Sequence, residues 1–75
     1  MRGAWTVLAS LENAEANRCV DIFRRDDGSF GFEEYRRDPE DRGSWTLVAY
    51  HAFRVFATRE EVEAAAVGSI AWMTP

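Results

Sequence analysis

The length of 75 residues allows one domain, spanning residues 1–75, and a chain this short buries only about 60% of its unfolded surface. Hydrophobic residues make up 47% of the chain and include three Trp, two Tyr and five Phe, which is enough apolar material to fold unaided. The nine basic residues are all arginine; with thirteen acids they leave a net charge of −4, which repels phosphate backbones. The composition therefore excludes a disordered chain and disfavours a general nucleic-acid binder.

Cysteine content and hydropathy indicate a cytoplasmic protein. Cys19 is the only cysteine, so no disulfide can form within the chain, and small secreted domains usually depend on disulfides. The N-terminal stretch reaches Glu12 and Glu15 too early for a signal peptide, and no run approaches the roughly 20 apolar residues of a membrane span. We expect no membrane association and no cofactor, because the sequence has neither a glycine-rich phosphate loop nor a set of zinc ligands.

The N-terminal segment is compatible with either a strand or a helix. Residues 5–8, Trp-Thr-Val-Leu, have the composition of an edge strand. Residues 10–16 can form a helical turn, with Ser10 as its N-cap and Asn17 as its end. The sequence leaves this choice open.

Residues 19–25 and 30–36 are predicted to form a β-hairpin, because both are rich in β-branched and aromatic types. Asp26-Asp27-Gly28 has the signature of a three-residue loop, in which the glycine takes the left-handed conformation. This register pairs Arg24 with Phe30 and places four apolar residues on one face: Val20, Ile22, Phe30 and Phe32. The other face carries Asp21, Glu33, Arg25 and Tyr35, with Phe23 over Gly31. A two-residue loop would scatter charge over both faces, so the longer loop is preferred.

After a turn-rich linker at 38–44, residues 45–50 are predicted to form a third strand. Residues 53–57, Phe-Arg-Val-Phe-Ala, either continue that strand after a bend or form a short fourth one.

The periodicity then changes to that of a helix. Thr58 and Glu61 have the spacing of a capping box, in which each side chain accepts a hydrogen bond from the other residue's amide. Small and apolar residues recur on one helical face: Val62, Ala65, Ala66, Ser69, Ile70 and Met73. We therefore predict an α+β domain, an antiparallel meander of three or four strands with a helix from about Arg59 to Met73 packed on the Val20 face.

Two pairs of residues have the types needed for catalysis, but each pair also has an ordinary structural explanation. Asp21 and Glu33 are expected to lie opposite each other, but a solvated sheet face offers no cleft to raise one carboxyl pKa. Cys19 and His51 can be written as a nucleophile and base, yet a lone cysteine on a strand is usually a small buried hydrophobe. The sequence therefore favours a protein that is not an enzyme.

The arginines and aromatic residues are the best binding candidates. Arg18 is expected to face Arg36, and like charges directly opposite each other need an acid between them. Glu34 or Glu15 can supply that acid from within the chain, and a phosphate or a partner's carboxylate can supply it from outside. The candidate binding residues are Arg18, Arg25, Arg36, Arg37, Tyr35 and Trp45. Self-pairing on a solvated surface is the expected role for most of them.

The stretch from Glu12 to Asp41, ENAEANRCVDIFRRDDGSFGFEEYRRDPED, resembles the core of small bacterial proteins of unknown function, and Trp-Thr-Val-Leu at 5–8 fits them too. The order of strands, Asp-Gly turn and Thr-x-Glu-Glu helix start is similar, more loosely, to the YegP-like family. That resemblance implies a three-stranded sheet packed on one helix and a tendency to pair into larger sheets. The chain lacks the tandem repeat usual in that family.

These observations favour a non-enzymatic protein-interaction module, with a homodimer as one form of that interaction. The alternative is a protein that binds a small ligand or single-stranded nucleic acid through its arginine and aromatic surface. The partner is therefore expected to be another protein or a second copy, rather than nucleic acid or a membrane.

Overall fold

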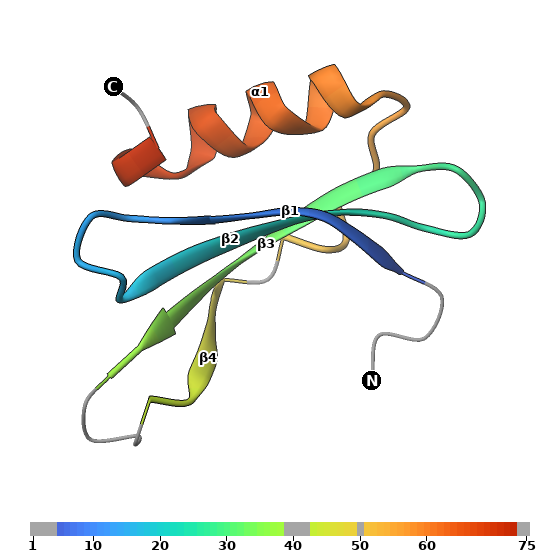
Figure 1. Cartoon of the computed structure of the whole chain (residues 1–75). Helices are drawn as coiled ribbons and strands as arrows, with labels where there is room; N and C mark the ends of the chain where they lie inside the picture. Colours follow the sequence, from blue (N-terminus) through green and yellow to red (C-terminus); the bar gives the residue numbers. More distant parts are fainter. Residues whose placement is uncertain (1–4, 39–42, 50, 74–75) are drawn as a thin grey trace.

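Four strands form one antiparallel sheet in the order β1-β2-β3-β4 (Figure 1). The computed structural model describes residues 5–38, 43–49 and 51–73. It contains β1 at Thr6–Glu12, β2 at Arg18–Arg24, β3 at Phe30–Arg37 and β4 at Trp45–Ala49. Each strand pairs with the next one along the chain, so the sheet is a meander. Together with helix α1, Arg59–Ser69, this confirms the predicted α+β fold.

The β2–β3 hairpin has the predicted register. Arg25 and Ser29 close the three-residue loop, and the Gly28 amide donates to the Arg25 carbonyl at 2.9 Å. Gly28 has φ +88°, the left-handed region that glycine enters without steric cost. Beyond the loop, Arg24 pairs with Phe30 and the pairing continues without a break to Arg18 and Arg36. The loop chemistry therefore sets which side chains share a face.

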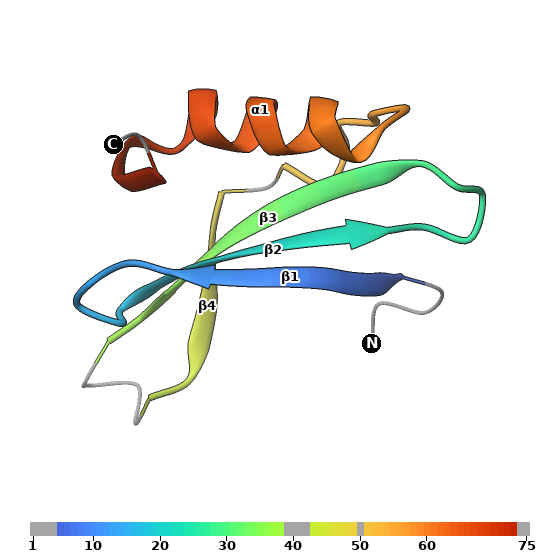
Figure 2. The same ribbon diagram turned by 45° about the horizontal axis from the view of Figure 1, so that its top comes forward.

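Helix α1 covers one face of the sheet, which we call the helix face, and packs on β2 and β3 (Figures 1 and 2). The buried core between them consists of Val20, Ile22, Phe32, Val62, Ala66 and Ile70. Phe30, Phe56, Ala65, Trp72 and Met73 pack around it and are partly buried. The predicted helix-packing face of the sheet is thus confirmed. Within the described ranges, no helix combines the length and the apolar composition that crossing a membrane requires.

The ends of the helix differ in part from the prediction. The Thr58 side chain accepts from the Glu61 amide at 3.1 Å, as expected of an N-cap. The Glu61 carboxylate accepts from the amide of Ala57, not of Thr58, so the second arm of the box reaches one residue further back. The α-helix ends at Ser69, and a short 3-10 helix, η2 at Ala71–Met73, follows it. The prediction of one continuous helix to Met73 was wrong, because Ile70 turns to extended geometry.

The N-terminal segment is a strand through Glu12, so a helical turn capped by Ser10 does not form. Ser10 pairs with Asp21 on β2, and its hydroxyl donates to the Asp21 carboxylate at 2.7 Å. The ladder with β2 satisfies more backbone groups than one helical turn would. Residues 13–17 form the connecting turn, in which the Asn13 side chain accepts from the amides of Asn17 and Arg18. β1 is therefore an additional edge strand of the sheet.

Residues 51–57 form neither a continuation of β4 nor a separate strand. Phe56 makes a single bridge to Phe30, with backbone bonds of 2.8 and 3.1 Å. A turn closed by the Arg54 amide and the His51 carbonyl precedes this bridge. The predicted strand at 45–50 is present as Trp45–Ala49, and Tyr50 and most of the 38–44 linker lie outside the described residues.

The face opposite the helix, which we call the outer face, has a tightly packed aromatic cluster. Phe23 is fully buried over Gly31, as predicted, and the Trp5 ring stacks on Phe23 with centroids 4.1 Å apart. A Cβ atom at Gly31 would lie 2.7 Å from two carbons of the Phe23 ring. The absence of a side chain at position 31 is therefore what allows this cluster to form.

We expect Gly31→Ala to destabilise the fold by about 1–3 kcal/mol, because the buried Phe23 ring cannot yield without displacing Trp5. Gly68→Ala is the matched control, because a Cβ there meets nothing within 4 Å and alanine favours a helix by about 0.5–1 kcal/mol. Urea denaturation midpoints would test both. Equal midpoint shifts in the same direction would contradict this packing.

A second prediction concerns the hairpin loop. The Ser29 hydroxyl and amide both donate to the Asp27 carboxylate, at 2.7 and 2.9 Å, and lower the pKa of Asp27 below its ordinary value. Ser29→Ala should raise that pKa, whereas Ser29→Thr, which keeps the hydroxyl, should leave it low; carboxyl NMR titration measures both. Because the folded-state pKa is the lower one, the stabilisation is present above the unfolded-state pKa and is lost as pH falls through the folded-state pKa. An unchanged titration in Ser29→Ala would contradict the assignment.

Candidate functional site

The carboxylates of the outer face are less exposed than the sequence suggested. Glu33 is only 6% exposed, so the expectation of a solvated face was wrong at this position. The Tyr35 hydroxyl lies 3.4 Å from the Glu33 carboxylate, and Asp21 accepts from Ser10 and, at 3.5 Å, from the Cys19 thiol. These donors supply the carboxylates with hydrogen bonds, as is usual for polar groups in a folded protein. The arrangement needs no catalytic explanation.

Cys19 and His51 lie on opposite faces of the sheet. Cys19 pairs with Tyr35 on the outer face. The His51 ring stacks on Phe32, whose side chain belongs to the helix-face core, with centroids 4.8 Å apart. A nucleophile and its base must come within hydrogen-bond reach of each other, which this placement does not provide. Among the residues that the structure describes, no three His, Cys, Asp or Glu side chains gather as metal ligands.

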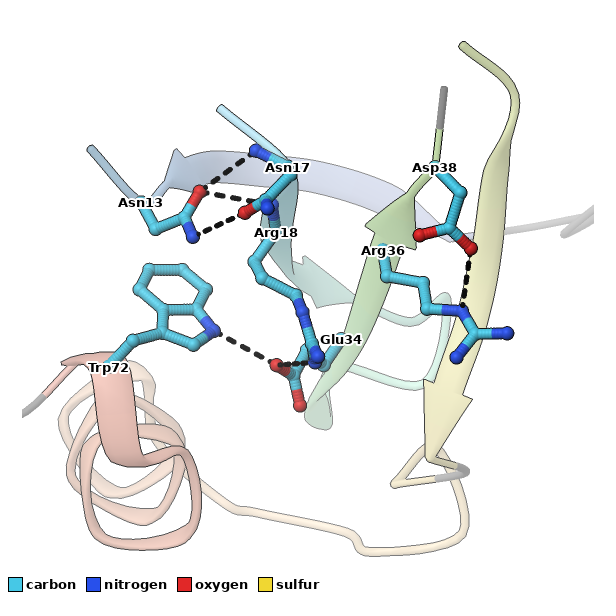
Figure 3. A network of polar contacts seen from close by, with 7 residues as sticks. All are labelled: Asn13, Asn17, Arg18, Glu34, Arg36, Asp38 and Trp72. Carbon is cyan, nitrogen blue, oxygen red and sulfur yellow. Dashed lines mark hydrogen bonds and ion pairs between the residues drawn. The ribbon is translucent and has the colours of Figure 1, made fainter. Parts of the chain in front are cut away.

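Arg18 and Arg36 face each other at the open end of the hairpin, as predicted, and each has an acidic partner (Figure 3). Arg18 Nη1 lies 3.4 Å from Glu34 Oε2, and Arg36 Nε lies 3.5 Å from Asp38 Oδ2. Glu34 is thus one of the two internal acids expected for this pair, and Asp38 takes the place of Glu15. The repulsion between the two guanidinium groups is therefore compensated within the chain.

Glu34 also accepts a hydrogen bond that the sequence did not suggest. The Trp72 indole Nε1 donates to Glu34 Oε2 at 2.9 Å, from the 3-10 helix across the helix face (Figure 3). Glu34 is 8% exposed, so its charge is held by Arg18 and this indole together. A buried carboxylate needs such hydrogen-bond partners, because leaving it unpaired away from water is costly. The three side chains thereby fasten the C-terminal end of the chain to the sheet.

Arg25 is held at the other end of the sheet, on the outer face. Its guanidinium lies 5.3 Å from the Trp5 ring centroid and 5.1 Å from that of Phe23. It also donates to the carbonyls of Phe30, at 3.1 Å, and Ala52. Arg25 therefore ties the hairpin to the segment that follows β4.

Arg37 and Trp45 pair across β3 and β4, also on the outer face. The Arg37 guanidinium lies 4.7 Å from the Trp45 ring centroid and donates to the Ala16 carbonyl at 2.6 Å. An open hollow of about 380 Å³ adjoins this arginine and is lined by Glu15, Ala16, Asn17, Arg37, Asp38 and Gly43. The six predicted binding residues therefore occupy three places: Arg18 and Arg36 on the helix face, Arg25 at the loop end of the outer face, and Arg37, Tyr35 and Trp45 at its opposite end.

Apolar side chains gather along the edge of the sheet beyond β3. Of the eight large apolar side chains that are exposed in the described part of the chain, five come from residues 45–55. They are Trp45, Leu47, Val48, Phe53 and Val55, and we call this set the apolar edge. Phe53 and Val55 are the most exposed, at 67% and 68%. Both β4 and the Phe56 bridge flank β3 on the side away from β2, so these residues share one edge.

Sequence reasoning found only Trp45 of this set. Leu47, Val48, Phe53 and Val55 were predicted only as members of strands, without a binding role. A signal was present, because from residue 43 to residue 57 the chain has a single arginine and no acid. Residues 64–75 have no charge at all, so a shortage of charge indicates surface that a partner can cover only where the fold also leaves the apolar side chains exposed.

Comparisons of the chain with protein-family models, with curated proteins and with solved structures found no match.

We expect Trp72→Phe to lower the free energy of unfolding by about 1–3 kcal/mol, because it removes the indole donor from a buried carboxylate. Glu63→Gln, which breaks the exposed Arg59–Glu63 pair on the helix, should change it by only about 0.5 kcal/mol or less. Circular dichroism during urea unfolding measures both without relying on tryptophan fluorescence. A loss in Trp72→Phe no larger than that in Glu63→Gln would show that the indole bond contributes nothing.

Proposed function

We propose that this chain is a non-enzymatic protein-interaction module that binds its partner through the apolar edge. The observation that carries the proposal is the gathering of five exposed apolar side chains along the sheet edge formed by residues 45–55. Monomeric proteins rarely expose contiguous apolar surface, and such patches usually mark interaction sites. β4 is also an edge strand, whose outward backbone groups can pair with another chain.

The geometry of β4 favours contacts with a partner's side chains over a long ladder of backbone hydrogen bonds. The pairing of β3 with β4 shifts register between Glu34 and Tyr35, so Val48 forms a bulge in the edge strand. Bulges increase the local twist and shorten the stretch that can add a further strand. Leu47 and Val48 are each about two-fifths exposed beside this bulge. Apolar contacts would therefore supply most of the binding energy.

Binding of a small ligand or of single-stranded nucleic acid through the arginines has less support. Arg18, Arg25 and Arg37 all donate to acceptors of the same chain. A phosphate would have to compete with these bonds, on a chain whose net charge is −4. Arg36 is the most exposed of the four candidate arginines, and it too has an acidic partner.

Photo-crosslinking in cells that make this protein naturally would test the proposal. A photoreactive benzoylphenylalanine replaces Val55 on the apolar edge or, as the matched control, Leu11, an exposed apolar residue on the opposite edge strand β1. We expect protein adducts from position 55 in several-fold excess over those from position 11, because only the first site lies in the proposed interface.

Two results would overturn the proposal. Equal adduct yields at positions 55 and 11 would mean that the apolar edge is not a preferred contact surface. Adducts that nuclease treatment removes would instead support the alternative of single-stranded nucleic acid.

A further inference from the structure

None of the five side chains of the apolar edge is charged, and the Arg37 guanidinium lies over the Trp45 ring at one end of it. Arg54 is the one residue with a permanent charge in the sequence from 43 to 57. Its side chain lies on the helix side of the sheet. Its Nη1 donates to the Ser69 hydroxyl at 2.9 Å, and its guanidinium lies 5.4 Å from the ring centroids of Phe32 and Phe56. A partner that placed charges against this edge would lose their hydration without gaining an ion pair. The surface therefore fits a partner that is itself apolar and uncharged.

The lack of charge on the apolar edge allows the edges of two copies to lie against each other. In a two-fold dimer the same patch of each copy lies against its counterpart, so a charged patch would repel itself. The neutral edge creates no such repulsion. The exposed helix surface differs, because Glu60, Glu61 and Glu63 would place acid against acid in a symmetric contact.

The apolar edge can form the centre of a symmetric interface. A stable interface buries about 800 Å² per partner, roughly a sixth of the 4864 Å² that this chain exposes. β4 has five residues, about 17 Å at the usual rise of a strand, which is too little for such an interface alone. Phe53 and Val55 lengthen the apolar surface along the same side of β3. The strand and the segment after it together offer more apolar surface than β4 alone, and polar neighbours would form the rim of the interface.

We propose that the apolar edge is covered by a second copy of this chain, related by a two-fold axis that sets β4 antiparallel to β4 of the partner. This proposal rests on the proposed function, since it names the partner of the same surface. A short ladder beside the Val48 bulge joins the two β4 strands, and Phe53 and Val55 of each copy lie beyond the end of its own β4, at the two ends of the junction. Both figures place β4 clear of helix α1 of the same copy (Figures 1 and 2).

The test is the solution mass of the full chain, from about 1 µM to about 1 mM and at both low and high salt. The expected species has twice the mass of the 8.6 kDa chain and persists at high salt, because apolar contacts are not screened. Val55→Glu, at a residue 68% exposed, should raise the dimer dissociation constant at least about 100-fold, because it places an unpaired charge in an apolar interface. Leu11→Glu on β1, the matched control, should leave the constant unchanged.

Several outcomes would overturn the proposal. These are a monomer at every concentration, a dimer that dissociates at high salt, and a dimer that Leu11→Glu disrupts while Val55→Glu does not. Circular dichroism checks that each variant is folded, and Leu47→Glu tests the same edge should Val55→Glu fail to fold. A monomer whose position 55 crosslinks to a different protein would overturn the second copy alone and leave the interaction module standing.

Discussion

The register of the β2–β3 hairpin is the constraint on which the rest of the structure depends. Gly28 enters the left-handed region and lets three residues close the loop, so that Arg25 pairs with Ser29. A slip of one residue would turn the apolar side chains of one strand away from those of the other. With the observed register, Val20 and Phe32 lie under helix α1, and Phe23 lies over Gly31 on the outer face.

Charge on this small sheet is used mainly to hold the chain together. Glu34 connects β3 to Arg18 of β2 and to the Trp72 indole after the helix, so one buried carboxylate joins three elements. Arg25 does the same at the opposite end, where it joins the hairpin to the carbonyl of Ala52. A domain that buries so little surface gains from such ties, because its apolar core is small. The arginine pairs that stand out in the sequence are thus largely structural.

What remains without a structural role is apolar. The helix covers β2 and β3, while the edge beyond β3 keeps Leu47, Phe53 and Val55 exposed. Exposing these side chains contributes nothing to folding, and it promotes association with other chains. The charged surface of the molecule is suited to contact with water, whereas the neutral apolar edge is suited to contact with another protein.

The sequence by itself determined the hairpin, the faces of its strands, the helix start and the helix-packed core, because loop glycine, alternation and capping are local signals. Only the tertiary structure decided the conformation of residues 6–12 and 51–57. Pairing with β2 outweighed a possible helical turn at Ser10. A turn after His51 interrupted the strand pattern of the second segment. It also decided the candidate site. Which arginines find acceptors, and which apolar residues stay uncovered, depends on contacts such as Arg37 with Ala16 that are distant along the chain.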